Sequence, residues 1–260
     1  MDKVIVVKIG GATFTGGDTT IADLVTLQHE GKPVVVVHGG GNRVTGWLKR
    51  LGVATHFVHG ERVTDRAVLE VVIAVLGGLV NKEIVAAINN SGGRAVGISG
   101  VDGGLLHGRV KDRALGYVAE VVRVNPEPVK TLLQASCIPV IAPVTLNSSD
   151  RMADAPPILN INGDHVAGEL AVALAAGRLI FLTDVAGVCD QSGGLLPRLS
   201  ADEAEALIAS GVASGGMVPK IRACLRALSV NSAARIIDGR QPHALLREMA
   251  GQGGGTTIYH

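Results

Sequence analysis

Short runs of aliphatic, often β-branched residues alternate along the chain with longer segments whose apolar positions recur at helical spacing. The short runs predict buried strands at residues 4–9, 33–37, 95–98, 138–142, 178–183, 234–237 and 256–259. The helical spacing predicts helices at residues 21–30, 43–51, 64–88, 126–136, 165–175, 202–210, 217–228 and 242–249. Residues 104–123 have a weak period of two, which favours short antiparallel strands. Strands that alternate with helices in this way indicate an α/β protein with a mainly parallel sheet.

Residues 143–157 are rich in Ser, Asn, Asp and Pro, a composition typical of a connecting segment. With 260 residues, the chain is either a large single domain or two closely joined lobes. We therefore expect a hinge here, between an N-terminal lobe of about residues 1–155 and a C-terminal lobe of about residues 156–260. Hydrophobic residues make up 47% of the chain and aromatic residues only 2%, so the core should consist of Val, Ile, Leu and Ala.

Composition and charge exclude several partners. The net charge is +1 and no run of Lys and Arg is present, so we expect no nucleic-acid partner. The apolar stretches look shorter than the roughly 20 residues that span a bilayer, and no signal peptide is recognisable, so we expect no membrane association. The three cysteines form no C-x-x-C pair, which favours reduced thiols and a cytoplasmic location.

Two glycine clusters follow the first two predicted strands, Gly10 with Gly11 and residues 39–41. Ligands of open α/β sheets bind beyond the carboxyl ends of the strands, where glycine lets the backbone approach an anion and helix N-termini offer free N–H groups. Two such loops could hold one polyanion; the alternative is that they are only tight turns. Neither is a G-x-G-x-x-G fingerprint, and the chain has no Walker A, H-E-x-x-H or G-x-S-x-G motif.

Two lysines are candidates for binding this anion. Lys8 interrupts an apolar strand directly before its glycines, where a buried lysine is costly unless it is paired or binds an anion. Lys220 lies in the first turns of a predicted helix that follows Ser214 and two glycines. The alternatives are that Lys8 extends to solvent at the strand end and that Lys220 belongs to a solvated helix face.

Polar residues elsewhere could bind a carboxylate. Arg62, just before the long predicted helix, could grip one through two hydrogen bonds, or could form an ion pair with Glu61 or Asp65. Asn160 and Asp164 are four positions apart and share a face if the segment is extended. Asp164 could instead cap the helix that follows, which would leave Asn160 unexplained.

These segments together resemble the N-acetylglutamate kinases of the amino acid kinase family. The matching segments are Val-Lys-Ile-Gly-Gly (7–11), His-Gly-Gly-Gly (38–41), Glu-Arg-Val-Thr-Asp (61–65), Asn-Ile-Asn-Gly-Asp (160–164), Thr-Asp-Val-Ala-Gly-Val (183–188), Gly-Gly-Met-Val-Pro-Lys (215–220) and Gly-Thr-Thr-Ile (255–258). They occur in the order and at the spacing of that family, nearly from end to end. The resemblance implies a single amino acid kinase domain, a three-layer αβα sandwich with a mainly parallel central sheet.

The resemblance also implies roles for individual residues. The N-terminal lobe would bind an acyl-amino acid and the C-terminal lobe ATP. The implied catalytic residues are Lys8 and Lys220, which would neutralise the transferring phosphoryl group, and Asp164, which would orient both lysines. The implied substrate-binding residues are Gly40, Gly41, Arg62 and Asn160. The implied nucleotide-binding residues are Gly10, Gly11, Thr183, Asp184, Gly187, Val212, Ser214 and Met217.

The implied reaction agrees with the residues. A side-chain carboxylate has a pKa of about 4.3 and is ionised at neutral pH, so it needs no general base to attack ATP. The expected activity moves the γ-phosphate of ATP to the side-chain carboxylate of N-acetyl-L-glutamate and gives N-acetyl-L-glutamyl 5-phosphate, an intermediate of arginine biosynthesis. Lysines, helix N-termini and Mg²⁺ carried by the nucleotide would neutralise charge along the transfer path, so no protein metal site is expected.

Some positions depart from the family pattern. Asn42 stands where proline is common and Val101 where lysine is usual, which leaves the fine choice of substrate open. The chain starts almost at its first strand, from which we expect a homodimer without arginine feedback. The alternatives are a kinase for a related substrate, such as acetylated or carrier-linked aminoadipate or glutamate of lysine biosynthesis, and a catalytically silent regulatory module on the same fold.

Overall fold

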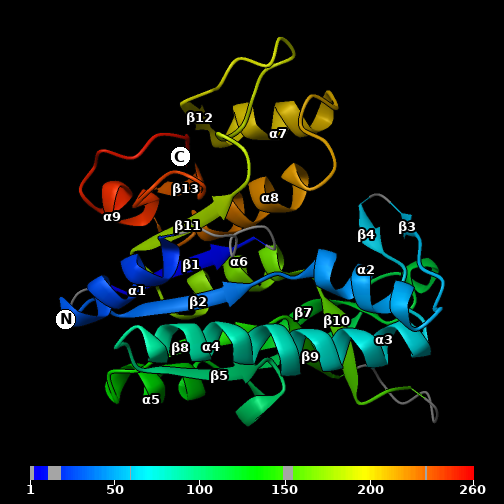
Figure 1. Cartoon of the computed structure of the whole chain (residues 1–260). Helices are drawn as coiled ribbons and strands as arrows, with labels where there is room; N and C mark the ends of the chain where they lie inside the picture. The colour runs from blue at the N-terminus through cyan, green and yellow to red at the C-terminus, as the bar shows by residue number, and fades with distance from the viewer. Residues whose placement is uncertain (1–2, 11–18, 59, 149–154, 232) are drawn as a thin grey trace.

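The structure is a computed structural model that describes residues 3–10, 19–58, 60–148, 155–231 and 233–260 (Figure 1). Its strands are β1 (Ile5–Ile9), β2 (Val34–His38), β3 (Phe57–Val58), β4 (Glu61–Arg62), β5 (Ala95–Ser99), β6 (Leu106–Val110), β7 (Val118–Val124), β8 (Ile138–Ala142), β9 (Val144–Asn147), β10 (Ile158–Ile161), β11 (Arg178–Thr183), β12 (Arg198–Ser200), β13 (Ala233–Asp238) and β14 (Thr256–Tyr259). Its helices are α1 (Thr20–His29), α2 (Gly41–Arg50), α3 (Arg66–Val72), α4 (Asn81–Asn90), α5 (Glu127–Gln134), α6 (Gly163–Ala173), α7 (Ala201–Ala209), α8 (Met217–Ala227) and α9 (Ala244–Met249). A π-helix, η1 (Ile73–Val80), joins α3 to α4, and η2 (Asp102–Gly104) and η3 (Arg113–Leu115) are short 3₁₀ turns.

The centre of the molecule is an eight-stranded sheet in the order β12-β14-β13-β11-β1-β2-β8-β5. Its strands pair in parallel except at β13 and β14, which are antiparallel. Helices cover both faces (Figure 1). The predicted α/β class and three-layer sandwich are therefore confirmed, and each strand and helix predicted from the apolar pattern is present with ends that differ by a few residues.

Successive side chains along a strand point to opposite faces of the sheet. The core is therefore divided into two clusters, and the position of a polar residue along its strand determines which face its side chain is on. On β1, Val6 packs against α6 and α8, whereas Val7 packs towards α1 and the helices from α2 to α4. Lys8 is two positions from Val6, so its side chain is on the same face of the sheet and points to α6 and α8. On β2, His38 is two positions from Val36, so its side chain is on the opposite face and points to α4.

Strands β6, β7, β9 and β10 form a small closed barrel beside the sheet. Strands β6 and β7 are antiparallel, as the weak period of two in residues 104–123 predicts. The expected hinge is wrong for its first part, because Val144–Asn147 is strand β9 and pairs with β10 and β6. Residues 149–154 of that segment lie outside the described residues. The barrel pairings also cross the predicted lobe boundary, since β10 pairs with β7 and β9.

The continuous helix Arg66–Asn90 corrects the expectation about apolar stretches. Its 25 residues include a window of mean hydropathy 2.0, long and apolar enough to cross a membrane by length and composition. Within the fold, however, its segments pack on α1, α2, β5, β8 and β9. Only 44% of that window is buried. Asp65 caps the helix, because its side chain accepts a hydrogen bond from the Val68 N–H.

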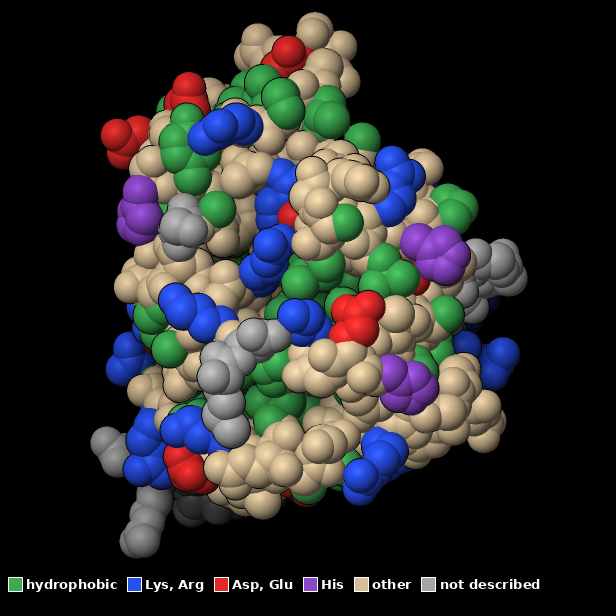
Figure 2. Space-filling view, turned by 90° about the vertical axis from the view of Figure 1, so that its left-hand side faces the viewer, with side chains coloured by type: hydrophobic (Ala, Val, Ile, Leu, Met, Phe, Trp, Pro, Cys, Tyr) green, Lys and Arg blue, Asp and Glu red, His purple; other side chains and the backbone are tan. Residues whose placement is uncertain are grey.

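On the face shown in Figure 2, Lys and Arg side chains lie among apolar and other polar side chains, with fewer Asp and Glu side chains. The three cysteines, Cys137, Cys189 and Cys224, are free.

Candidate active site

A buried carboxylate lies between two lysines at the carboxyl end of the central strands. Lys8 Nζ on β1 is 2.7 Å from Asp164 Oδ1, and Lys220 Nζ on α8 is 3.1 Å from Asp164 Oδ2. The Asp164 side chain is 6% exposed, that of Lys8 9% and that of Lys220 18%. The fold thus brings together the three predicted catalytic residues. Even the two that are nearest in sequence, Asp164 and Lys220, are 56 positions apart.

Local structure explains why these three side chains meet. The Lys8 side chain is on the face of β1 that packs against α6, and its ammonium is paired with Asp164. The alternative that Lys8 extends to solvent is therefore wrong. The N-cap of α6 is Asn162, whose side chain accepts a hydrogen bond from the Asp164 N–H at 2.8 Å. The alternative that Asp164 is only a capping residue is therefore wrong, because the cap is supplied two positions earlier and the carboxylate is left for the lysines.

The charges of the three groups favour an additional anion. Burial, which opposes ionisation, is the largest influence on the pKa of Asp164, but the charges of Lys8 and Lys220 together outweigh it and lower that pKa. The carboxylate is therefore ionised at neutral pH, and two cations share one anion. The contact of Lys8 Nζ with Asp164 Oδ1 has the length of a charge-assisted hydrogen bond. An ammonium group has three hydrogens, so the others on Lys8 remain available to a ligand.

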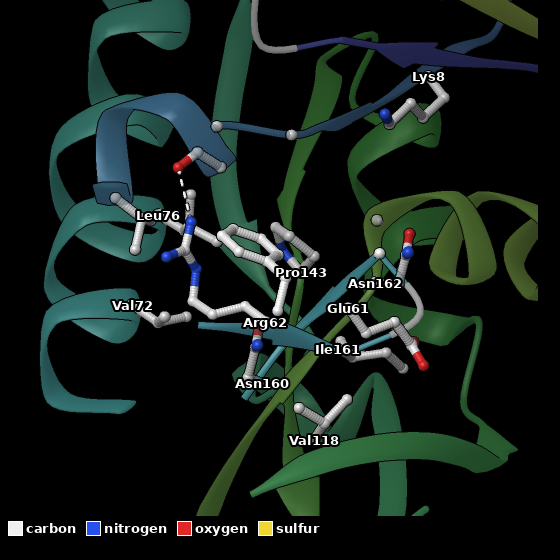
Figure 3. A pocket seen from close by; sticks show the side chains of 17 residues that line it. Lys8, Glu61, Arg62, Val72, Leu76, Val118, Pro143, Asn160, Ile161 and Asn162 are labelled. Atoms are coloured by element: carbon white, nitrogen blue, oxygen red, sulfur yellow. Dashed lines mark hydrogen bonds between the residues drawn. The ribbon is translucent and has the colours of Figure 1, made fainter. Parts of the chain in front are cut away.

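A cavity of about 260 Å³ opens beside Lys8 (Figure 3). It is lined by the triple glycine of residues 39–41, by Arg62 and Asn160, and by apolar side chains that include Phe57, Val72, Leu76 and Ile161. A cavity with apolar walls and a few cationic and amide groups suits a small organic acid.

Arg62 projects into this cavity with its charge unpaired. Its guanidinium donates to Thr55 Oγ1 at 2.8 Å, to Thr45 Oγ1 at 2.7 Å and to the Gly41 carbonyl at 3.0 Å. It also lies 4.6 Å from the centre of the Phe57 ring. The predicted alternative, an ion pair with Glu61 or Asp65, is wrong.

Those two carboxylates have other partners. Glu61 pairs with Lys111 at 2.7 Å, and Asp65 caps α3. Burial lowers the pKa of Arg62, yet an arginine stays charged at neutral pH. No carboxylate among the described residues balances this charge, so the cavity favours an anionic ligand.

The triple glycine has backbone N–H groups to offer. Gly40 has a φ of 139°, and a Cβ there would lie 2.7 Å from Leu76 Cδ2, so the position requires glycine. Within the described part of the chain, the N–H groups of Gly40 and Gly41 donate to no protein acceptor. Asn160 lies nearby and its amide donates to Thr64 Oγ1 at 3.0 Å.

The predicted nucleotide-binding residues that the structure describes do not line this cavity. Gly10 donates its N–H to the Leu182 carbonyl at the end of β11, while Gly11 lies outside the described residues. Thr183 is buried and its hydroxyl donates to the carbonyl oxygens of Val185 and Ile237. Of the other predicted nucleotide-binding residues, Asp184 and Ser214 are exposed, and Val212 and Met217 are half-buried. Gly187 is closely packed, because a Cβ at that position would lie 2.6 Å from Thr256 Oγ1.

The sequence did not identify several groups that shape the site. Thr45 and Thr55 orient Arg62, and His38 and Asn81 lie behind the triple glycine. His38 stood at the end of an apolar strand and began the matching segment His-Gly-Gly-Gly (38–41), but neither signal gave it a role. Nothing in the sequence pointed to Asn81, which lies inside a long helical pattern.

Comparison with known proteins identifies the family. Residues 3–238 match the model of the amino acid kinase family, so the chain belongs to that family. Two relatives named acetylglutamate kinase illustrate the likeness. One, from Dehalococcoides mccartyi strain BAV1, is 49% identical over 257 residues, which is 99% of this chain and 94% of that protein. Another, from Cereibacter sphaeroides, is 46% identical and covers 98% of this chain and 87% of that protein.

Solved structures have the same fold. A Streptococcus mutans protein superimposes with a TM-score of 0.84 at 27% identity and covers 100% of this chain and 99% of that one. Carbamate kinase from Giardia lamblia bound to AMP-PNP superimposes with a TM-score of 0.70 at 18% identity, with 99% and 98% coverage. At that identity the second likeness concerns the fold alone.

Proposed function

We propose that this protein is an ATP-dependent kinase that phosphorylates the side-chain carboxylate of N-acetyl-L-glutamate and forms N-acetyl-L-glutamyl 5-phosphate in arginine biosynthesis. One observation carries this proposal: a cavity for a small organic acid opens directly at a buried centre with two lysines and one carboxylate. The relatives that share 42–49% of the sequence over nearly its full length are named for this activity.

The two substrates are both anions, and the cavity offers a separate group for each charge. Arg62 binds the α-carboxylate of the acyl-amino acid, Asn160 binds its amide region, and the N–H groups of Gly40 and Gly41 bind the reacting carboxylate. Lys8 and Lys220 neutralise the phosphoryl group in transit, and Asp164 orients both ammonium groups. In this proposal the N-terminal lobe binds the acyl-amino acid and the C-terminal lobe binds ATP, through Gly10, Gly11 and the residues from Thr183 to Met217 named above.

The chemical step needs no proton transfer. A carboxylate oxygen of the acyl-amino acid attacks the γ-phosphorus, a new P–O bond forms, and the bond between that phosphorus and the bridging oxygen of ADP breaks. The products are an acyl phosphate and ADP, so charge and atoms balance without a general base. The protein must hold two anions in line against their repulsion, and the excess positive charge of the lysines and Arg62 does this.

Mg²⁺ belongs to the proposal as a companion of ATP. No group of three or more His, Cys, Asp and Glu side chains within the described ranges is arranged to hold a metal ion. Independently of that search, we assign Mg²⁺ to the phosphate oxygens of the nucleotide, where it would neutralise developing charge.

Location and assembly are also part of the proposal. The free cysteines support a cytoplasmic location. The proposed assembly is a homodimer. Light scattering of the purified protein would give the mass of a dimer, and a monomer at micromolar concentration would overturn this part.

A coupled ADP-release assay tests the activity. N-acetyl-L-glutamate, N-acetyl-aminoadipate and glutamate are supplied separately with ATP and Mg²⁺, and hydroxylamine traps any acyl phosphate. We expect hydroxamate and ADP in equal amounts with N-acetyl-L-glutamate. A preference for the aminoadipate compound would replace the proposed substrate, and no product with any of the three would overturn the kinase assignment.

A further inference from the structure

His38 lies behind the triple glycine, out of reach of a substrate in the cavity, and bonds directly to the loop. It is the last residue of β2 and only 1% exposed. Its Nδ1 is 2.7 Å from the carbonyl oxygen of Gly39. Its Nε2 is 3.3 Å from the side-chain amide nitrogen of Asn81, the first residue of α4.

The surrounding hydrogen bonds fix the orientation of the Asn81 amide. Its oxygen accepts from Lys82 Nζ at 3.0 Å, and an ammonium group can only donate. Its nitrogen lies 2.9 Å from the Val140 carbonyl and 3.3 Å from the Ile98 carbonyl, which can only accept. The atom that faces His38 is therefore the NH₂ group, a donor.

This orientation selects one tautomer of His38. The Gly39 carbonyl can only accept, so Nδ1 carries the proton that is donated to it. The Asn81 NH₂ group has two hydrogens for three neighbouring acceptors, and it repels a protonated Nε2, so it favours a neutral ring with an unprotonated Nε2. Both neighbours favour the same tautomer, and the ring connects the buried end of α4 to the glycine loop.

The bond to Gly39 decides where the next N–H points. In a trans peptide the carbonyl and the N–H point in opposite directions. When His38 holds the Gly39 carbonyl towards α4, the Gly40 N–H is directed away from the ring, on the side of the cavity that residues 39–41 line. A peptide turned the other way would place a carbonyl oxygen there, which would repel a carboxylate.

The other side of the loop is held by packing. Leu76 and Val80 of the π-helix η1 lie against Gly40, at 2.7 Å and 3.4 Å from the place where a Cβ would be. The π-helix ends at Val80, and Asn81 follows. One helical segment therefore supplies both the packing against Gly40 and the amide that selects the His38 tautomer, in agreement with the frequent occurrence of π-helical turns at functional sites.

We propose that His38 is a positioning residue that, held as the Nδ1-protonated neutral tautomer by Asn81, orients the Gly39–Gly40 peptide so that the Gly40 N–H binds the anionic acyl-amino-acid substrate. The inference rests on the proposed function for the identity of the substrate. It goes beyond that function because it assigns a role to two residues that do not touch the substrate.

Electrostatics supports a neutral ring. Burial is the main cause that lowers the pKa of His38 to about 4, the bond to Gly39 opposes this, and the charges of Lys8 and Lys82 lower it further. A protonated ring would place a third cation near Lys8 and would have no acceptor at Nε2.

Two substitutions of His38 test the proposal. An asparagine side chain places its NH₂ group near the position of Nδ1, whereas a glutamine reaches the position of Nε2. His38→Asn can therefore keep the bond to Gly39, and His38→Gln loses it. Loss of one such bond corresponds to about a five- to tenfold change in affinity. We expect His38→Gln to raise KM for N-acetyl-L-glutamate about five- to tenfold more than His38→Asn, with KM for ATP unchanged in both.

Glu248→Gln serves as a control for lost stability. It removes a buried ion pair of α9 that lies outside the cavity, so its KM for N-acetyl-L-glutamate should equal that of the unaltered protein. Equal KM values for the two His38 variants, or a rise in KM for ATP as large as that for N-acetyl-L-glutamate, would overturn the proposal.

Nitrogen NMR of the unaltered protein gives a readout that does not depend on activity. We expect the His38 ring at pH 7 to show a protonated Nδ1 and an unprotonated Nε2, and Asn81→Leu to lose this preference. An Nε2-protonated ring, or an imidazolium, would overturn the inference. Failure of the proposed function is recognised separately, because the unaltered protein would then form no product from N-acetyl-L-glutamate while the tautomer could still be read.

Discussion

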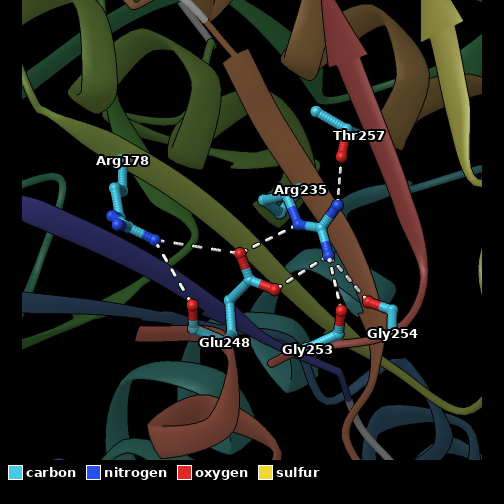
Figure 4. Close-up of polar contacts among 6 residues, drawn as sticks. All are labelled: Arg178, Arg235, Glu248, Gly253, Gly254 and Thr257. Atoms are coloured by element: carbon cyan, nitrogen blue, oxygen red, sulfur yellow. Dashed lines mark hydrogen bonds and ion pairs between the residues drawn. The ribbon is translucent and has the colours of Figure 1, made fainter. Parts of the chain in front are cut away.

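Two buried carboxylates in this molecule each lie between two cations, and they differ in what those cations do. Asp164 lies between Lys8 and Lys220, and Glu248 lies between Arg235 and Arg178 (Figure 4). Both carboxylate side chains are 6% exposed. Burial and net charge alone therefore do not distinguish the two centres.

The hydrogen bonds distinguish them. Arg235 donates to both oxygens of Glu248 at 2.9 Å and also to Thr257 and to the carbonyl oxygens of Gly253 and Gly254. Each of its three guanidinium nitrogens already donates to a protein acceptor. Lys220 donates to Asp164 and to the Gly216 carbonyl, and Lys8 has only its ion pair with Asp164 among the described contacts. The arginine centre ties α9 to the sheet, whereas the lysine centre keeps donors for a ligand.

The largest expected effect is on catalysis at the lysine centre. Lys8→Ala and Lys220→Ala should each lower kcat about 10²- to 10³-fold and change KM much less, because the lost interaction is with the transferring phosphoryl group. Steady-state kinetics with both substrates would measure this. Lys130→Ala, at an exposed pair with Glu127, is the matched control and should be neutral. A change in KM alone would exclude the transition-state role.

The next effect is on stability at the arginine centre. Glu248→Gln should lower the free energy of unfolding by about 3 kcal/mol, because it leaves Arg235 buried and unpaired. Urea denaturation would measure the loss, while kcat stays near that of the unaltered protein. Arg178→Gln is the control: this side chain is 44% exposed and 3.9 Å from Glu248, so its loss should cost under about 1 kcal/mol. A large fall in kcat without a loss of stability in Glu248→Gln would abolish the distinction between the centres.

Arg62 is intermediate between the two centres. Like Arg235 it donates to protein groups, but these groups are neutral, so its charge is unbalanced. Arg62→Ala should raise KM for N-acetyl-L-glutamate about 10- to 100-fold, as expected for a lost charge-assisted hydrogen bond, with a smaller effect on KM for ATP. Arg43→Ala, which removes an exposed pair with Glu83, should leave both KM values unchanged. Unaltered affinity in Arg62→Ala would refute the carboxylate role.

The smallest effect concerns the pH dependence of stability. His38 has a pKa of about 4 in the folded protein and about 6.5 when unfolded. Below pH 6.5 the unfolded state takes up this proton and the folded state does not, so stability falls until the pH reaches about 4. At pH 5.5 the loss is about 1 kcal/mol. Thermal melting between pH 7.5 and about 5 should show a shallower loss in His38→Asn, and equal slopes would refute the assignment.

Local sequence signals predicted most of the fold, because strand and helix periodicity is a property of neighbouring residues. Lys8 was recognisable as an anion-binding candidate from its place in an apolar strand directly before two glycines. The same local view failed where a residue's partner is distant. It gave Asp164 a possible capping role that Asn162 fulfils, and it offered Glu61 to Arg62, although Glu61 pairs with Lys111.

The sequence by itself determined the α/β class, the order of its elements and a set of polar residues at strand ends. Its resemblance to the amino acid kinase family implied a carboxylate acceptor, and a carboxylate is ionised at neutral pH and needs no base. Only the tertiary structure decided that Lys8 and Lys220 share one carboxylate, that Arg62 keeps an unbalanced charge, and that the Asn81 amide lies beside the His38 ring. The physical reason is that charge pairing and hydrogen-bond direction depend on distances of about 3 Å between residues far apart in sequence, which periodicity does not encode.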